Sequence, residues 1–303
     1  MKKLNLIFAI LIGLIITSCS SDDTVENNNS EKKLVKITYQ DLSNQNQSDI
    51  HIIYDSNNNI SEINDDDGLL LQKFTYNSVN KIIKTESYYY YNQILEYKDI
   101  TSITYDANNK ISTIIETYIS YNTDGSISSQ ESTNHTFTYS NNSIIRLSDD
   151  FSNTKVEYAL SNGLFTRIKV YRNNTLKSDM TFTYDSEGNC ISGSGPINEG
   201  SLDSTTNNIE LSVLYGSEEK NPIFNKFFDI NILTRTSFYN LRQTLVDQQG
   251  NKYAEEIQWY QYSNYPYKET NENTFDNNGY ILSKKQSEFP DHPNYGMTIY
   301  TWE

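Results

Sequence analysis

Apolar and polar residues in this chain recur in a short pattern that marks turns along most of its length. An aromatic residue comes first, and in most cases Asp or Asn follows it. Asn, Gly or Ser stands four residues after the aromatic, and an apolar residue stands six residues after it. The segments with this pattern begin at Tyr54, Tyr76, Tyr105, Tyr121, Tyr139, Tyr158, Tyr184 and Phe275. Recurrence at fixed offsets indicates a repeated supersecondary unit.

The chemistry of the pattern predicts that the unit is a β-hairpin. A hairpin loop of four or five residues needs one residue at positive φ, which Gly and Asn tolerate best. Asp or Asn at the start of the loop can accept a backbone hydrogen bond as an Asx turn. The aromatic and the apolar residue at the sixth position then flank the loop on neighbouring strands, where we expect them to pack as a cross-strand pair.

The spacing of the units predicts the fold class. Intervals of 16 to 29 residues between the first seven aromatics fit a meander with one turn signal per two strands. The 25 Tyr residues and the abundant Ile and Thr favour strands, and the abundant Asn and Ser favour turns. The sequence predicts an all-β protein, an antiparallel meander of hairpins forming one large curved sheet. A barrel-like closure and two abutting sheets stay open as alternatives.

The repeat is interrupted before its last copy. Residues 193–208 are rich in Gly, Ser and Asn, which predicts a long loop and a candidate sub-boundary. Asn221-Pro222 is a helix-start signal, and the apolar spacing after it predicts a short helix near 222–229, lying on the sheet or plugging one end. Strands are expected to resume over 236–246, and the last one covers 297–302.

The N-terminus has the layout of an export signal. Lys2 and Lys3 precede an apolar run from Leu4 to Ile16, and Ser18-Cys19 follows directly. The segment resembles the lipobox of bacterial lipoproteins. That resemblance implies a signal peptide over 1–18 and acylation of Cys19 as the first mature residue. The alternative is an ordinary cysteine in an N-terminal anchor helix.

The remaining chain divides into a tether and a body. Residues 19–34 are polar, acidic and without apolar periodicity, as expected of a flexible tether. The repeats assign 35–303 to one β domain. The formal net charge of −15 disfavours nucleic acid as a partner.

The repeat also resembles a known sequence family. Phe275-Asp276-Asn277-Asn278-Gly279-Tyr280-Ile281 is similar to the YD repeat of Rhs-type secreted proteins, whose core reads Tyr-Asp-x-x-Gly-x-Leu/Ile. This chain often has Asn in place of that Gly, and its spacing is irregular. Ser20-Ser21-Asp22-Asp23 resembles the export tag of Bacteroidota surface lipoproteins. The resemblance implies an uncharacterised surface lipoprotein of the outer membrane facing outward, with the periplasmic face as the alternative.

Candidate chemistry is sparse. The histidines lack metal-ligand spacing, no cofactor or catalytic motif is present, and we expect a protein that is not an enzyme. Cys190 stands at the apolar position of its repeat, which predicts a small buried residue and no disulfide. Asp65-Asp66-Asp67 is either a calcium-binding run or, as we expect, a solvated turn.

Two aromatic clusters are the candidates for ligand binding. Exposed rings stack on sugars or peptides, whereas in the alternative reading they are ordinary strand residues. The ligand-stacking candidates are Tyr89, Tyr91, Trp259, Tyr260 and Tyr262. The sequence thus predicts a non-enzymatic binding or scaffold surface, attached to the bilayer through Cys19 and facing a glycan or protein partner. A glycan-binding or glycan-processing component of an uptake system is the alternative.

Overall fold

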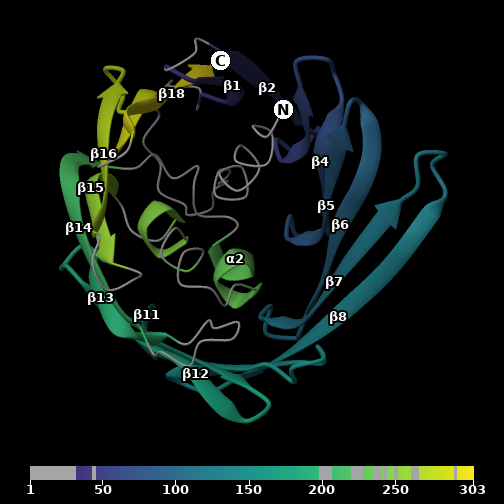
Figure 1. Ribbon diagram of the computed structural model, residues 1–303, viewed down its shortest axis with the longest axis vertical. Coiled ribbons are helices and arrows are strands. Elements are labelled where there is room, and N and C mark those ends of the chain that lie inside the picture. Colours follow the sequence, from purple (N-terminus) through teal and green to yellow (C-terminus); the bar gives the residue numbers. More distant parts are fainter. Residues whose placement is uncertain are drawn as a thin grey trace.

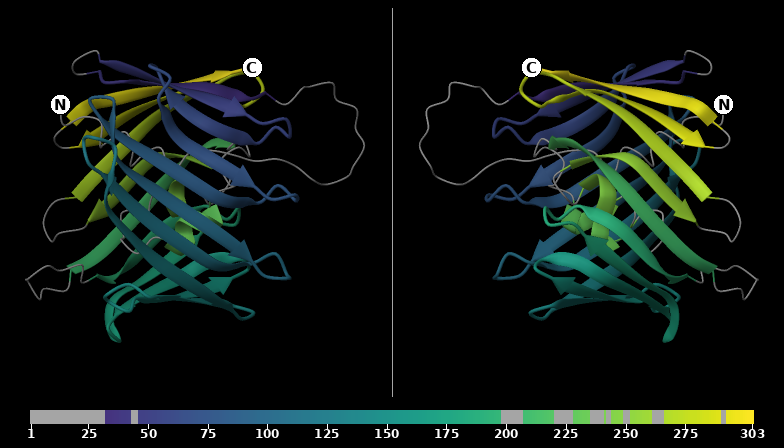
Figure 2. Two further views of the ribbon diagram at one scale, coloured as in Figure 1. Left: turned by 90° about the vertical axis from the view of Figure 1, so that its right-hand side faces the viewer. Right: turned by 90° about the vertical axis from the view of Figure 1, so that its left-hand side faces the viewer.

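The chain folds into a closed antiparallel β-barrel of 18 strands (Figure 1). The computed structural model describes residues 32–42, 46–197, 207–219, 228–234, 241, 244–248, 252–260, 266–289 and 292–303. Each strand pairs with the next in sequence, and the last strand pairs with the first. The strands are tilted against the barrel axis, as closure of a sheet requires (Figure 2). The predicted all-β meander is therefore confirmed in its barrel form.

The strands are β1 (Leu34–Gln40), β2 (Gln47–Tyr54), β3 (Ile60–Asp65), β4 (Leu70–Tyr76), β5 (Ile82–Tyr91), β6 (Ile94–Tyr105), β7 (Ile111–Tyr121), β8 (Ile127–Tyr139), β9 (Ser143–Ser148), β10 (Lys155–Ser161), β11 (Leu164–Arg172), β12 (Thr175–Tyr184), β13 (Cys190–Ile197), β14 (Asn207–Glu219), β15 (Lys252–Tyr260), β16 (Pro266–Phe275), β17 (Ile281–Phe289) and β18 (His292–Trp302). The helix α2 (Phe228–Thr234) and a π-helical turn (Thr244–Gln248) come between β14 and β15.

The repeat turns have the predicted geometry. After Tyr54, the side chain of Asp55 accepts hydrogen bonds from the backbone N–H groups of Asn57 and Asn59, both at 2.8 Å, and Asn58 has a φ of 61°. The same Asx turn, with Asn or Gly at positive φ, follows Tyr76, Tyr105, Tyr184 and Phe275.

The turns after Tyr158 and Tyr139 close differently. Asn162 and Gly163, with φ of 52° and 80°, form a two-residue turn between the paired residues Ser161 and Leu164. After Tyr139, the N–H of Ser140 donates directly to the carbonyl of Ser143 at 2.9 Å. The strand meander is kept in both cases.

The aromatic residues of the repeat join consecutive hairpins. The hydroxyl of Tyr76 donates to the carbonyl of Ile60 at 2.9 Å, and that of Tyr105 donates to the carbonyl of Ile82 at 2.8 Å. Each acceptor is the sixth-position residue of the preceding repeat. Equivalent bonds link Tyr54 to Leu34, Tyr184 to Phe165, Tyr215 to Cys190, and the indole of Trp302 to Ile281. We name these six bonds the aromatic clasp.

Lysines also contact the aromatic rings of later repeats. Lys81 and Lys110 occupy the fifth position of their repeats. The ammonium of Lys81 lies 4.8 Å from the ring centroid of Tyr105 in the next repeat, and that of Lys110 lies 5.1 Å from the ring centroid of Tyr139, two repeats on. Such cation–π contacts contribute about 0.5–1 kcal/mol each at exposed sites. Burial raises the pKa of Tyr54 to about 12, against the hydrogen bond to Leu34, so its phenol stays protonated and can donate.

The inside of the barrel is the hydrophobic core. Eighteen strands enclose more space than wall side chains alone can fill. The helix α2 lies inside the barrel (Figure 1), and its residues Ile232 and Leu233 belong to the same buried cluster as strand residues from around the wall. Arg146 donates to the carbonyl of Leu233 at 2.7 Å, and the hydroxyl of Tyr158 lies 3.3 Å from it. The C-terminal end of the helix thus meets a cation and a phenol from the wall.

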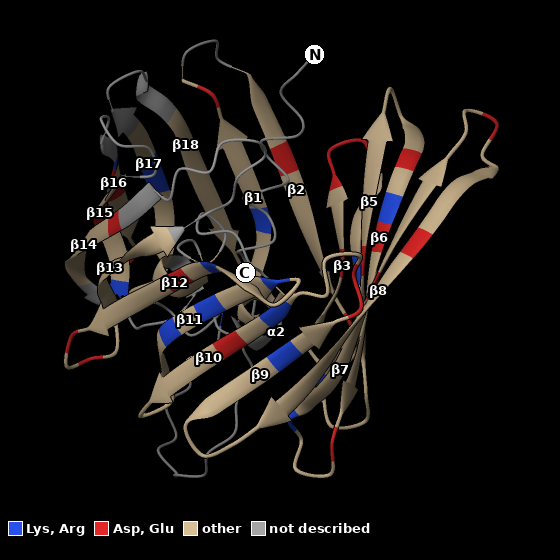
Figure 3. Ribbon diagram, turned by 60° about the horizontal axis from the view of Figure 1, so that its bottom comes forward, with Lys and Arg blue, Asp and Glu red and all other residues tan. Residues whose placement is uncertain are grey.

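The outside of the barrel is polar. Side chains alternate between the two faces of a strand, so Lys36, beside the buried Ile37, points outward. Polar pairs bridge neighbouring strands on this face, among them Lys36–Asp49, Lys73–Glu62, Arg167–Asp179, Thr117–Ser132, Thr183–Ser192 and Thr274–Ser283. Figure 3 shows charged residues along strands around the wall. Exposed apolar residues such as Ile53 and Leu147 occur between them.

The structure corrects the expected loop over 193–208. β13 continues to Ile197 and β14 begins at Asn207, so 198–206 alone lie outside the described residues in this region. A Cβ atom at Gly193 would stand 2.8 Å from the ring of Phe182, and one at Gly195 would overlap the carbonyl of Asp179. The glycines are needed for close approach within a strand rather than for a flexible loop.

The segment between β14 and β15 agrees with the prediction in part. The helix α2 covers Phe228–Thr234, so the predicted helix near 222–229 is confirmed at 228 and 229 and continues to Thr234, while 220–227 lie outside the described residues. The strand expected over 236–246 is wrong at 244–246, which belong to the π-helical turn. A short apolar run fits a buried helix as well as a strand, and here Leu245 and Val246 pack in the barrel core. One continuous sheet replaces the alternative of two domains.

Removal of one clasp hydroxyl is expected to destabilise the barrel. Tyr76→Phe leaves the carbonyl of Ile60, itself fully buried, without its donor, and should lower the free energy of unfolding by about 0.5–1.5 kcal/mol. Denaturant unfolding measures the change. Tyr91→Phe is the control, because that ring is 51% exposed, and it should change nothing. Equal stability of both variants and the parent protein would contradict a stabilising role of the clasp.

Candidate functional site

Three tyrosines form a continuous aromatic surface on the inner wall, which we name the tyrosine array. Tyr89 of β5 and Tyr97 of β6 are paired in register, and their rings stack with centroids 4.1 Å apart at 21°. The ring of Tyr118 on β7 follows at 5.4 Å from Tyr97. Tyr97 lies six residues from Ile103 on a regular stretch of β6, and Ile103 is buried in the core, so both face inward.

Carboxylates flank the array. Asp99 on β6, Tyr118 on β7 and Glu131 on β8 are direct cross-strand neighbours, so one ring stands between two acids. Tyr118 is 42% exposed. Burial, then the nearby Tyr118 and Asp99, raise the pKa of Tyr97, so its phenol stays a neutral hydrogen-bond donor at neutral pH. The surface can offer ring faces together with hydrogen-bond acceptors.

A Ser, a His and a Glu are linked deeper on the same wall. His135 Nδ1 lies 2.7 Å from Ser148 Oγ, and its Nε2 lies 2.8 Å from Glu116 Oε2. Ser148 is 8% exposed, whereas the side chain of Glu116 is 44% exposed. A nucleophilic serine must face its substrate, with the acid behind it. Here the carboxylate is the exposed member, so the arrangement presents an acid to the interior instead of a nucleophile.

The structure separates the aromatic residues that the sequence grouped. Tyr89 lies in the tyrosine array, and Tyr91 is exposed beside the β5–β6 turn. Trp259 is 4% exposed and packs in the core. The side chain of Tyr260 and all of Tyr262 lie outside the described residues. Four consecutive tyrosines in a strand cannot share one face, so the cluster divides between inside and outside.

Sequence reasoning missed Tyr97 and Tyr118. Neither stands in an aromatic-rich segment, and what joins them to Tyr89 is the pairing register of three strands. The available signal was the spacing of two residues between Tyr97 and Asp99, which places both side chains on one face of a strand. The register that brings in Tyr118 is set by hairpin loops of different lengths.

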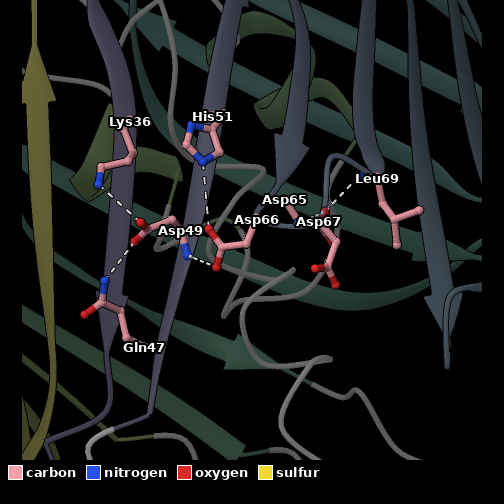
Figure 4. Close-up of polar contacts among 8 residues, drawn as sticks. All are labelled: Lys36, Gln47, Asp49, His51, Asp65, Asp66, Asp67 and Leu69. Carbon is pink, nitrogen blue, oxygen red and sulfur yellow. Dashed lines mark hydrogen bonds and ion pairs between the residues drawn. The ribbon is translucent and has the colours of Figure 1, made fainter.

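The acidic run at 65–67 forms a turn in which the carboxylates of Asp65 and Asp66 accept backbone hydrogen bonds (Figure 4). Asp65 accepts hydrogen bonds from the backbone N–H groups of Asp67 at 3.0 Å and Leu69 at 2.8 Å. Asp66 accepts from the N–H of Asp49 at 2.9 Å and lies 3.8 Å from His51 Nε2. Within the described ranges, no three His, Cys, Asp or Glu side chains are grouped to hold a metal ion.

Asp49 ties this turn to β1. Burial would raise the pKa of Asp49, but hydrogen bonds from Thr38, Lys36 and Gln47 and the charge of Lys36 outweigh burial and hold it below its usual value. Figure 4 shows Lys36 and Gln47 converging on this carboxylate. The polar contacts of this region stabilise the outer face.

Cys190 is fully buried, and burial raises the pKa of its thiol to about 12. The thiolate is the nucleophilic form of cysteine, so this side chain is a small core residue. In the part of the chain that the structure describes, no helix has the length and apolarity to span a bilayer.

The two kinds of aromatic position should respond differently to truncation. Trp259→Ala opens a cavity in the core and should cost about 3–5 kcal/mol of the free energy of unfolding. Tyr118→Ala removes a ring that is 42% exposed and should cost about 1 kcal/mol or less. Denaturant titration of both variants measures the difference. A mild effect of Trp259→Ala would show that this ring is not part of the core.

No family model and no curated protein matches the chain. Solved structures with a similar fold include a porin-like protein from Bacteroides uniformis, 12% identical with a TM-score of 0.34, over 89% of this chain and 96% of that one. A porin-like protein from Bacteroides vulgatus is 8% identical with a TM-score of 0.42, over 89% and 98%.

A chain of the TcdB2-TccC3-Cdc42 structure is 12% identical with a TM-score of 0.29; the match covers 87% of this chain and 14% of that chain's length. These likenesses concern the course of the backbone alone, and no activity follows from them.

Proposed function

We propose that the protein is a lipid-anchored binding scaffold without enzymatic activity, held at the outer membrane or cell surface by acylated Cys19, with its barrel in water. The observation that carries the proposal is the polar outer face. A barrel that spans a bilayer presents an apolar band about 25 Å tall to the lipid, and a Lys or Arg at mid-depth costs about 2–4 kcal/mol.

The strands of this barrel do not present such a band in the described residues. Lys36, Arg167 and Lys285 point outward from strands of the wall, each with an acidic partner. The apolar Leu147 is flanked across the strands by Thr136 and Lys155. The buried apolar side chains of the strands form one core cluster inside the barrel with Ile232 and Leu233 of α2.

The sequence before β1 suits a tether. Lys32 and Lys33 are hydrogen-bonded to the barrel, at Tyr280, Asp276 and Glu303. The 12 residues from Ser20 to Glu31 could extend to at most about 43 Å at about 3.3–3.6 Å per residue. That reach holds a water-exposed body clear of the surface to which Cys19 attaches. Several acyl chains give firm attachment, since each buried CH₂ contributes about 0.8 kcal/mol.

Loss of the acylated cysteine should free the whole protein. The parent protein is expected in the membrane fraction, and Cys19→Ala in the soluble fraction, because the barrel adds no lipid-facing surface. Fractionation and incorporation of a clickable fatty acid measure both properties. Cys190→Ala is the matched control and should stay membrane-bound and acylated. If Cys19→Ala stays in carbonate-washed membranes, the barrel itself is embedded and the proposal fails.

Glycan recognition is the second candidate function, and the tyrosine array favours it. Ring faces stack on the C–H faces of sugars, and Glu131 next to Tyr118 supplies an acceptor for hydroxyl groups. The array replaces the aromatic cluster around Trp259 as the place for such a ligand, because that ring is buried.

Truncation within the array tests this second function. On a glycan array, Tyr97→Ala and Tyr118→Ala should each lower binding about tenfold, equivalent to about 1.4 kcal/mol. Tyr91→Ala is the control, being exposed at a turn outside the array. Undiminished binding by both array variants would remove the tyrosine array as the site.

A further inference from the structure

One part of β8 extends beyond the closed ring of strands. Its pairing with β7 begins at Ile127, whereas its pairing with β9 begins only at His135. Among the strands that the structure describes, the segment from Ile127 to Thr133 is therefore paired on one side alone. At about 3.4 Å per residue, it adds about 24 Å of strand beyond the end of β9. Closure removes the edges of the ring, but this segment, which we name the β8 edge, keeps one.

Backbone groups of alternate residues point to the open side of the β8 edge. The N–H of Asn134 donates to Asp149 Oδ1 at 2.6 Å, and its carbonyl accepts from the N–H of Asp149 at 3.1 Å. Asn134 thus turns both backbone groups away from β7. Because these groups alternate along an antiparallel strand, Ser132 and Gln130 turn theirs to the same side, where β9 no longer follows. The N–H and carbonyl groups of both residues are open to a further strand.

The β8 edge is accessible. Every residue from Ile127 to Ser132 is exposed, and Ile127 is 56% exposed although it stands at the sixth position of its repeat. The same position is fully buried at Ile60 and Ile281. Proteins commonly block open strand edges with Lys or Pro, and the β8 edge contains neither. An open edge of this kind is a template on which another chain can add a strand.

The charged residues of the β8 edge and of its two adjoining turns are all acidic. Glu131 is the only charged residue of the edge, and it is exposed. Asp124 stands in the turn before β8, and Asp150 and the 98% exposed Phe151 stand in the turn at the foot of the edge. A second copy of this chain would bring the same acids and a formal charge of −15 to the contact. A strand with basic and apolar side chains fits better.

We propose that the β8 edge is a docking site for an extended, basic segment of a protein partner, which adds to the sheet as a further strand. Backbone hydrogen bonds to Gln130 and Ser132 hold the segment, a Lys or Arg of the segment pairs with Glu131, and an apolar side chain packs on Phe151. The proposal rests on the proposed scaffold function and names its class of partner. It does not involve Cys19, so the anchor and the docking site can fail separately.

The test uses the full mature protein, immobilised through a tag after Glu303. Glu303 is hydrogen-bonded to Lys33 before β1, and because strands alternate in direction, this is the end of the barrel opposite to the β8 edge. The probe is a synthetic peptide of alternating Lys and Val, and surface plasmon resonance measures its affinity. Its two counterparts have Glu in place of Lys, or an N-methyl group on every residue. We expect only the unmodified Lys peptide to bind, because Glu repels Glu131 and N-methylation removes the backbone donors.

Variants of the protein locate the site. Gln130→Pro removes an N–H that faces the open side, so it should keep the melting temperature and lower the affinity about tenfold. Glu131→Lys should reverse the preference, so that the Glu peptide binds. Phe151→Ser should weaken binding, whereas Val79→Ser is the matched control, being 63% exposed in a turn at the other end of the barrel, and should change nothing.

Four results would overturn the docking site. If the N-methylated peptide binds as well as the Lys peptide, the mode is not strand addition. If Gln130→Pro melts as the parent does and binds undiminished, the β8 edge is not the place. If no peptide binds, the basic partner is wrong. If the parent sediments as a dimer that Gln130→Pro converts to a monomer, the β8 edge pairs with a second copy instead.

Discussion

Closure of the sheet is the constraint on which the rest of the structure depends. A ring of 18 strands has no free edges, but its interior is too wide to be filled by side chains of the wall. The chain solves this by sending α2 and the π-helical turn into the interior, where Ile232 and Leu245 complete the core. The outer face is then left to water, and the wall can carry charges and hydroxyl groups along its length.

The aromatic clasp makes this closure modular. Each clasp hydroxyl donates to a backbone carbonyl of the preceding hairpin. Each hairpin is therefore held in place by a hydrogen bond to its neighbour. The clasp also holds the strands on each side of the seam between β18 and β1: Tyr54 of β2 donates to Leu34 at the start of β1, and Trp302 at the end of β18 donates to Ile281 of β17. Deep burial raises the pKa of such phenols, which keeps the donors protonated over the physiological range.

The polarity of the inner wall changes along the strands. Ile103 and Ile114 face each other in the core; farther along the same strands come Glu116, and then Asp99 and Tyr118. On another part of the wall, buried amide and phenol oxygens stand without partners. A core that needed only stability would not place these groups inside. The partly exposed Tyr118 and the carboxylates paired with it are the physical reason to look for a ligand inside the barrel.

The sequence by itself determined the hairpin unit, because turn chemistry is local: Asp55 and Asn58 act within one loop, and their geometry follows from residue type. It also determined the all-β class and the burial of Cys190. Only the tertiary structure decided that the sheet closes, that Gly193 and Gly195 belong to a strand, and that Trp259 is core while Tyr118 is exposed. Those outcomes depend on register and on contacts between residues far apart in sequence, which a local pattern does not encode.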